Sequence, residues 1–285
     1  MGPSACHSAV IAVIGDVALD YTIEVHPGSG ADEKKKVARS SRALGGTAAN
    51  TAAQIVKLGT RAELVSVIGD DDTGEWLRRQ LKSVGIGSKS IATRAGSSTF
   101  VTIVLEDFAR NVYVDLGVGE EIHIENYEAI AAVDLIYVSY APQVIRDLVR
   151  RGYGPRLVVG LEHWMTDADV LEASKQARLI ITNSAGLNTL DLDGFGDVVV
   201  THGAAGVELR QHGRLVESIP AVLVDAVDAT GAGDSFAGAL CHSIANGDEL
   251  VESIRFAAAV AALSTLAVGA QEAQPTMGQV KSFGQ

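Results

Sequence analysis

The sequence predicts an α/β fold in which a mainly parallel sheet carries helices on both faces. Several short runs, such as residues 156–161 and 178–182, are apolar almost throughout, which is typical of parallel strands covered on both sides. Segments of helical length lie between these runs, so right-handed crossovers would join successive strands. The 285 residues are 47% apolar and 20% charged, enough to bury the core of one large domain.

The expected elements follow in order along the chain. Strands are predicted at residues 9–14, 63–68, 99–105, 111–116, 134–138, 156–161, 178–182, 197–201 and 206–210. Helices are predicted at residues 47–58, 73–84, 142–151, 166–176, 234–246 and 249–268. Gly59 and Gly85 directly follow the first two helices, at the position where a glycine often ends a helix.

Residues 21–41 and 99–116 depart from this alternation. The first segment contains the loop PGSGADEKKK between extended pieces, and the second has the pattern of a hairpin around residues 106–110. We therefore expect a small β-layer outside the main sheet.

The composition excludes several classes of protein. A net charge of −12 argues against nucleic acid as a partner, because nucleic-acid-binding proteins usually carry a basic face. Cys6 and Cys241 are too few for a disulfide framework and lack metal-ligand spacing. No apolar run reaches the length of about 18 residues that a membrane span needs. These features predict a cytoplasmic protein without a membrane partner.

The segment VDATGAGDSF at residues 227–236 carries the clearest chemical signal. It is expected to join a short apolar strand at residues 221–224 to a helix. The amides of Ala232, Gly233 and Asp234 would lie at the helix N-terminus, where unpaired N–H groups bind anions. Asp234 would repel such an anion, so its natural role is to accept a proton from a hydroxyl nucleophile. The segment therefore indicates phosphoryl transfer to an alcohol, although an isolated G-x-G-D is also explained by a helix-capping Asp.

The longer string resembles the C-terminal signature of the PfkB/ribokinase family of carbohydrate kinases. The resemblance continues in LGGTAAN at residues 44–50, VIGDDDTGEWL at 67–77, THGAAG at 201–206 and FAAAVAALSTLAVGAQ at 256–271. It implies a ribokinase-like three-layer α/β/α sandwich formed by residues 1–285 as a single kinase domain. A small β-sheet would form a lid from residues near 17–41 and 99–116.

For the reaction, the resemblance implies ATP-dependent phosphorylation of a hydroxyl group on a sugar or sugar-like small molecule. Asp234 corresponds to the general base, and Gly231, Ala232 and Gly233 correspond to the anion hole. Loss of one such donor costs roughly 3 kcal/mol of transition-state stabilisation in other enzymes. Mg²⁺ would accompany ATP by bridging phosphate oxygens. A homodimer through the lid is also implied, because some relatives assemble in this way.

On the nucleotide side, Thr201, Gly203 and Gly206 correspond to a phosphate-binding loop, whose small side chains allow close approach of the backbone. Asp228 and Thr230 correspond to positions near a monovalent-cation site, for an ion such as K⁺. Without the resemblance, a plain turn would explain the first group and turn-stabilising polar residues the second.

On the acceptor side, Gly45 and Gly46 correspond to bare backbone that faces a polyol, and Asn50 follows them in the next helix. Asp20 corresponds to the acidic residue that binds sugar hydroxyls, and Asp16 is a second candidate. Carboxylates at the end of the first strand fit the crevice where open α/β sheets bind ligands. For Asp16 alone, a polar cap at the end of the strand is an equally simple reading.

Three departures from the family pattern limit what the resemblance implies. Asn183 is present for nucleotide and metal handling, but Gly186 replaces the Glu that relatives carry three residues later. Ala258 lies where many relatives have Asn near the adenine, and residues 136–143 lack the acidic residue of some members. Arg110, at the predicted hairpin tip, is either a lid cation that approaches a substrate anion or a solvated tip.

The sequence leaves the acceptor open. A nucleoside kinase of the same fold is an alternative, disfavoured by the scarcity of aromatic residues near the acceptor motifs, since a base usually stacks. A catalytically weak ligand-binding or regulatory relative is another, favoured by Gly186. His163 and Trp164 follow an apolar strand and either face the crevice or form an ordinary loop pair.

Overall fold

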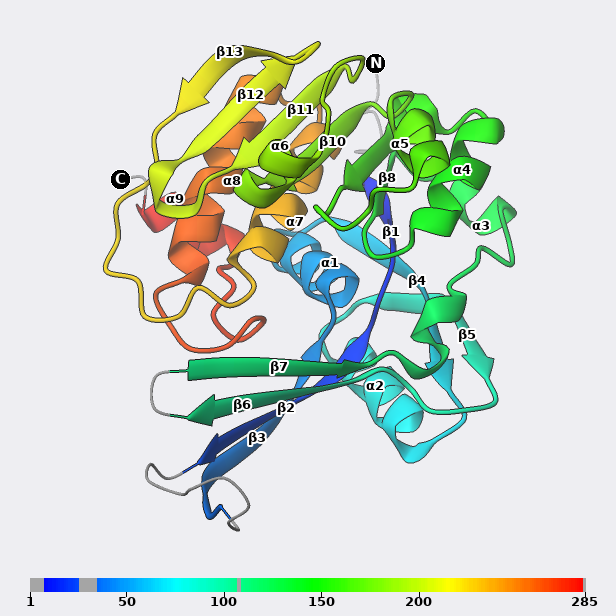
Figure 1. Ribbon diagram of the computed structural model, residues 1–285, viewed down its shortest axis with the longest axis vertical. Helices are drawn as coiled ribbons and strands as arrows, with labels where there is room; N and C mark the ends of the chain where they lie inside the picture. Colours follow the sequence, from blue (N-terminus) through cyan, green and yellow to red (C-terminus); the bar gives the residue numbers. More distant parts are fainter. Residues whose placement is uncertain (1–7, 26–34, 107–108, 284–285) are drawn as a thin grey trace, which may run out of the picture.

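The computed structural model describes residues 8–25, 35–106 and 109–283, which form two β-sheets with flanking helices (Figure 1). The larger sheet has nine strands in the order β13-β12-β11-β10-β9-β8-β1-β4-β5. They are β1 (Val10–Ile14), β4 (Arg61–Gly69), β5 (Gly87–Arg94), β8 (Leu135–Val138), β9 (Leu157–Gly160), β10 (Leu179–Asn183), β11 (Asp197–Thr201), β12 (Val207–Gln211) and β13 (Arg214–Ile219). From β5 to β11 neighbouring strands run parallel, whereas β12 and β13 add an antiparallel hairpin at one edge.

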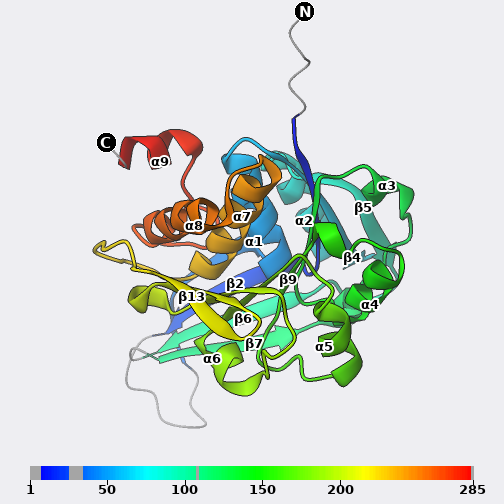
Figure 2. The ribbon, with the colours of Figure 1, turned by 90° about the horizontal axis from the view of Figure 1, so that it is seen from above.

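Helices cover both faces of the larger sheet, as the sequence predicts. They are α1 (Thr47–Lys57), α2 (Asp72–Ser83), α3 (Glu128–Ala131), α4 (Pro142–Arg150), α5 (Ala168–Ser174), α6 (Ser184–Thr189), α7 (Ala232–Ala245), α8 (Leu250–Ser264) and α9 (Met277–Phe283), with short 3-10 turns at Gly117–Glu121, Gly154–Arg156 and Gly203–Ala205. α1, α2, α7 and α8 share one core, and α4 and α5 share the other (Figure 2). In β1, Ile11 and Val13 belong to the first core, whereas Ala12 and Ile14 belong to the second. Because both faces are buried, the central strands are apolar throughout.

The smaller sheet has four strands in the order β3-β2-β6-β7. They are β2 (Ala18–Val25), β3 (Val37–Gly45), β6 (Phe100–Glu106) and β7 (Ala109–Asp115). The smaller sheet projects from the rest of the molecule (Figure 1). It is joined to the centre of the larger sheet because β2 follows β1 after three residues. Residues 26–34, which include most of the loop PGSGADEKKK (residues 27–36), lie outside the described residues, as do 107 and 108.

The sequence did not predict β5, β13, α3, α6 and α9. β5 and β13 are the two edge strands of the larger sheet, and both are partly exposed. Their sequences GSKSIATR and RLVESI therefore contain no continuous apolar run. α3, α6 and α9 have only four, six and seven residues, which is too short for a clear helical period.

One predicted strand is wrong. Residues 221–224 form no strand. Their side chains line a cavity beside α7, which explains why this segment is apolar. α7 begins at Ala232 instead of residue 234, and α8 ends at Ser264 instead of residue 268. No helix among the described residues is long and apolar enough to cross a membrane.

Candidate active site

A cavity of about 490 Å³ lies between the smaller sheet and the N-terminal ends of α1 and α7. We call it the carboxylate cavity, because Asp16, Asp20 and Asp234 line it. Its other lining residues include Asn50 of α1 and Arg110 of β7. The fold thus gathers residues that the sequence separates widely.

The first turn of α7 presents free backbone amides. Gly231 adopts a left-handed conformation with φ of 76°, and a Cβ there would lie 2.9 Å from Ala270, so glycine is required. Among the described residues, the amides of Gly231, Gly233 and Asp234 have no acceptor, whereas the Ala232 amide donates to the Ala229 carbonyl at 3.2 Å. Of the amides expected at this helix end, that of Ala232 is thus engaged in the turn, whereas those of Gly231, Gly233 and Asp234 are free. The anion hole itself stays a prediction.

The Asp234 carboxylate is held by a hydrogen bond. Its Oδ2 atom accepts from Asn50 Nδ2 at 2.8 Å. Burial raises the pKa of Asp234 to about 8, against the effect of the Asn50 bond, and the charges of Asp16, Glu162 and Asp20 raise it further. A carboxylate with a pKa near neutrality is suited to accept a proton from a hydroxyl group.

Two buried glutamines of the C-terminal loop hold Asn50 in turn. Gln271 Nε2 donates to Asn50 Oδ1 at 2.8 Å, and Gln274 Nε2 donates to the Asn50 carbonyl at 2.9 Å. Lys57 of α1 donates to the carbonyls of both glutamines at 2.5 and 3.0 Å. Sequence reasoning missed this network, although Gln271 ends one of the segments that carry the family resemblance.

Asp16 and Asp20 differ in what their carboxylates do. Asp16 accepts hydrogen bonds from the amides of Thr47 at 3.1 Å and Ala48 at 3.2 Å, so it caps α1 as well as lining the cavity. Burial raises the pKa of Asp16 in spite of these bonds. Burial also raises the pKa of Asp20 to about 6; the Asp16 charge adds to this and the Arg110 charge opposes it. The Asp20 carboxylate therefore lines the cavity, and the Arg110 charge offsets only part of the cost of its burial.

The two glycines before α1 are required by close contacts within the protein. A Cβ at Gly45 would lie 2.2 Å from the Asp20 carboxyl group, and Gly45 does not line the cavity. Gly46 does line it, but with φ of 94° and a Cβ position 2.7 Å from the Asp16 carbonyl. Gly45 thus leaves room for Asp20, and the expectation that it presents bare backbone to a polyol stays a prediction.

Two aromatic rings also line the carboxylate cavity. Tyr140 and Trp164 follow β8 and β9, and their ring centroids are 5.3 Å apart. Both rings are exposed, by 39% and 46%, and Tyr140 has a φ of 53°. Positive φ is uncommon for a bulky residue. The sequence had suggested few aromatic residues here, because these two are remote from the acceptor motifs.

A second cavity, of about 320 Å³, adjoins the same helix end. We call it the apolar cavity, since most of its lining residues are Gly, Ala or Val. Thr201, Gly203 and Gly206 line it, as do Ala232 and Gly233. The N-terminus of α7 therefore lies between the two cavities, with Asp234 on one side and Gly233 on the other.

The remaining predicted residues line neither cavity, except for Thr230. Asn183 caps α6 by accepting from the Gly186 amide at 3.0 Å. Asp228 accepts from the amides of Thr230 at 2.9 Å and Gly269 at 3.0 Å. Burial opposes ionisation of Asp228, but these bonds outweigh it and lower the pKa. Thr230 lines the carboxylate cavity, and no three His, Cys, Asp or Glu side chains in the described part of the chain could together hold a metal ion.

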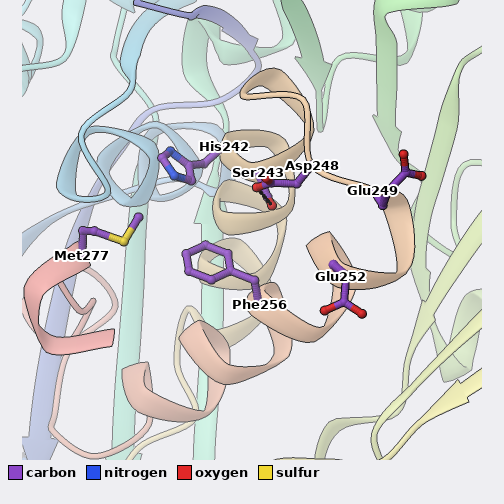
Figure 3. Close-up of a pocket in the computed structure, with 7 residues that line it drawn as sticks. All are labelled: His242, Ser243, Asp248, Glu249, Glu252, Phe256 and Met277. Atoms are coloured by element: carbon purple, nitrogen blue, oxygen red, sulfur yellow. Dashed lines mark hydrogen bonds between the residues drawn. The ribbon is translucent and has the colours of Figure 1, made fainter. Parts of the chain in front are cut away.

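A third pocket, of about 370 Å³, lies at the other end of α7 and is less suited to an anion (Figure 3). His242, Phe256 and Met277 line it together with Ser243, Asp248, Glu249 and Glu252. The carboxylates of Asp248, Glu249 and Glu252 disfavour a phosphoryl group there, because like charges repel. The two cavities at the N-terminus of α7 are therefore the better candidates for phosphate chemistry.

Comparison with known proteins gives separate evidence on the family and the fold. The family model described as "pfkB family carbohydrate kinase" matches residues 8–149 and 169–277. The chain is 30% identical over 286 residues to an "ATP-dependent ribose-1-phosphate kinase" of Halopiger xanaduensis, covering 94% of this chain and 96% of that protein.

Solved structures with the same fold include ribokinase from Thermotoga maritima, with a TM-score of 0.83 at 21% identity, covering 96% of this chain and 99% of that one. The Methanocaldococcus jannaschii nucleoside kinase has a TM-score of 0.82 at 22% identity, with 96% and 97% covered. Because the family model matches most of its length, this chain belongs to the pfkB family of carbohydrate kinases.

Proposed function

We propose that the protein phosphorylates a hydroxyl group of a sugar or sugar-like small molecule with ATP, and that Asp234 is the general base. The observation that carries this proposal is the position of the α7 N-terminus between two cavities. The acceptor would occupy the carboxylate cavity, where Asp234 can reach its hydroxyl. The nucleotide would occupy the apolar cavity, and the free amides would receive the transferred group.

The residues of the apolar cavity fit a nucleotide. Nothing lies within 4 Å of a Cβ built at Gly203 or Gly233, so both positions leave space beside the backbone for phosphate oxygens. The apolar walls suit a base. Bound Mg²⁺ would neutralise charge on the phosphates, and such an ion usually needs only one or two protein carboxylates.

Asp234 would accept the proton of the acceptor hydroxyl while its amide, with those of Gly231 and Gly233, stabilises the negative charge. Asn50 orients the carboxylate, and Asp20 and Asp16 would bind other hydroxyl groups. The apolar inner face of the smaller sheet, which includes Val101 and Val112, would exclude water as a lid. Exclusion matters because water competes as the nucleophile.

Three finer parts of the proposal concern the periphery. Arg110 would approach an anionic group of the substrate or the phosphates.

Asp228, with Thr230, would contribute to a monovalent-cation site such as one for K⁺. The carboxylate oxygens of Asp228 accept hydrogen bonds from two amides and keep further lone pairs for a cation. A homodimer would form through the smaller sheet, whose edge strand β7 exposes 62% of Tyr113; sedimentation equilibrium of the intact protein tests this.

A nucleoside is the second candidate for the acceptor. The Tyr140 and Trp164 rings offer an exposed aromatic surface within the carboxylate cavity, on which a base could stack. This observation removes the main objection that the sequence raised.

ATP consumption with Mg²⁺ should be measured across free sugars, sugar phosphates and nucleosides, with thermal shift as a parallel readout of binding. Turnover with any of these acceptors supports the kinase proposal, and the acceptor class with the highest kcat/KM decides between the two candidates. Binding of a sugar without turnover of any acceptor would instead identify a catalytically weak relative.

A further inference from the structure

We propose that the apolar cavity binds the purine nucleoside triphosphates with little discrimination among their bases, so that ATP is not the only phosphoryl donor. This inference rests on the proposed function. Only two of the side chains that line the cavity, those of Thr201 and Thr265, carry a polar group. Strong selection among bases requires polar partners that the wrong base leaves unpaired.

Neither threonine has a hydrogen left to donate. Thr201 Oγ1 donates to the Thr182 carbonyl at 3.3 Å, and Thr265 Oγ1 donates to the Ala262 carbonyl at 2.7 Å. A hydroxyl group has a single donor hydrogen. No side-chain donor therefore remains to distinguish the carbonyl oxygen of guanine or hypoxanthine from the amino group of adenine.

One wall of the cavity consists of alanines. Ala258, Ala261 and Ala262 of α8 all line it, as expected for residues three and four apart on one helix face. Their methyl groups contribute apolar contact, which every purine ring can use. The exocyclic groups that differ among purines meet no polar side chain on this wall.

The rim opposite this wall, at residues 221–225, offers both backbone donors and backbone acceptors. Residues 221–225 belong to no helix or strand, and among the described residues their amides have no hydrogen-bond acceptor. The Leu223 side chain in this segment is 89% exposed, so little packing fixes the rim. Because each residue here presents both an N–H and a C=O group, the rim can bond to either type of base edge.

The primary test is calorimetric titration of the intact protein with the Mg²⁺ complexes of ADP, GDP and IDP, which avoids turnover. We expect dissociation constants within about 100-fold of one another, the limit of discrimination by a pocket that reads shape alone. Binding of ADP with the others weaker by more than this overturns the inference and leaves the proposed function intact. Failure of all three to bind overturns both.

A matched pair of variants tests the cause. Ala258→Asn and Ala258→Leu add side chains of similar size, but only Asn brings hydrogen-bonding groups. We expect Ala258→Asn to change the ratio of ADP to GDP affinity by about tenfold, the effect of one hydrogen bond, and Ala258→Leu to change both affinities alike. Equal changes of the ratio in the two variants would show that missing polar groups are not the reason.

Discussion

The two cavities that meet at the N-terminus of α7 are built from opposite kinds of residues. The carboxylate cavity holds Asp16, Asp20 and Asp234. Backbone amides of α1 bond to Asp16, and the side-chain amide of Asn50, which Gln271 holds, bonds to Asp234. The apolar cavity is lined mainly by side chains no larger than valine. The carboxylate cavity can recognise a ligand by its hydrogen bonds, whereas the apolar cavity can recognise a ligand by its shape.

Grouping the carboxylates in one cavity has an energetic cost that the apolar cavity does not have. Three carboxylates that share one cavity disfavour each other's ionisation, and burial adds to the effect, as the raised pKa values of Asp234 and Asp20 indicate. Such an arrangement costs stability and is kept where binding or chemistry requires it. Selectivity is therefore expected on the acceptor side and tolerance on the nucleotide side.

Replacing Asp234 should give the largest difference between the effect on turnover and the effect on nucleotide binding. In Asp234→Asn we expect kcat to fall roughly 10²- to 10⁴-fold, because the proton acceptor is lost, while affinity for ADP does not fall. Steady-state kinetics and calorimetry measure the two effects. Asp169→Asn, at an exposed position on α5, is the control. Near-normal turnover in Asp234→Asn would remove the role assigned to this residue.

A pair of glycine substitutions should affect one cavity each. In Gly45→Ala the new methyl group displaces the Asp20 carboxyl, so acceptor kcat/KM should fall by as much as about 100-fold, the cost of a misplaced binding group. ADP affinity should stay unchanged. In Gly233→Ala the methyl group meets no protein atom but enters the space for phosphate, so ADP affinity should fall instead. If both variants affect both ligands equally, the cavities do not act separately.

A third substitution tests whether the position of Gly186 can hold a side chain. A Cβ at Gly186 would lie 1.9 Å from Thr182 Oγ1, so the Glu that the family resemblance leads one to expect here would not fit without adjustment. We expect Gly186→Ala to destabilise the protein by about 1–3 kcal/mol through overpacking. The penalty should shrink in a Thr182→Ala background. Urea unfolding of the four proteins measures the coupling, and strictly additive effects would contradict the steric explanation.

The sequence predicts the inner strands of the larger sheet and the α7 end because these depend on local patterns. The run DATGAGD contains both the turn and the carboxylate, and the apolar strands reveal burial on two faces. Gln271 and Asn50 are 221 residues apart, and no periodicity relates them. Tyr140 and Trp164 were missed as a pair for the same reason. The role of the Ala232 amide depends on a turn bond at 3.2 Å, which composition does not reveal.

A further expected effect is a dependence of stability on pH. Burial raises the pKa of Asp234 to about 8 in the folded protein, against an ordinary value of 3.8, so the folded state binds the proton more tightly than the unfolded state. Its contribution to stability is therefore complete below about pH 4 and is lost as the pH rises through about 8.

Asp234→Asn removes this loss. The difference in Tm between Asp234→Asn and the wild type should thus increase in favour of the variant from about pH 5 to about pH 8. Thermal melts in buffers of equal ionic strength measure it, with Asp169→Asn as the control that should show no such trend. The Asp20 carboxyl titrates in both proteins, and its coupling to the Asp234 charge is part of the difference that the comparison measures. A difference that does not change with pH would mean that Asp234 is ionised in the folded state across this range, and that the carboxylate cavity carries less mutual repulsion than its burial implies.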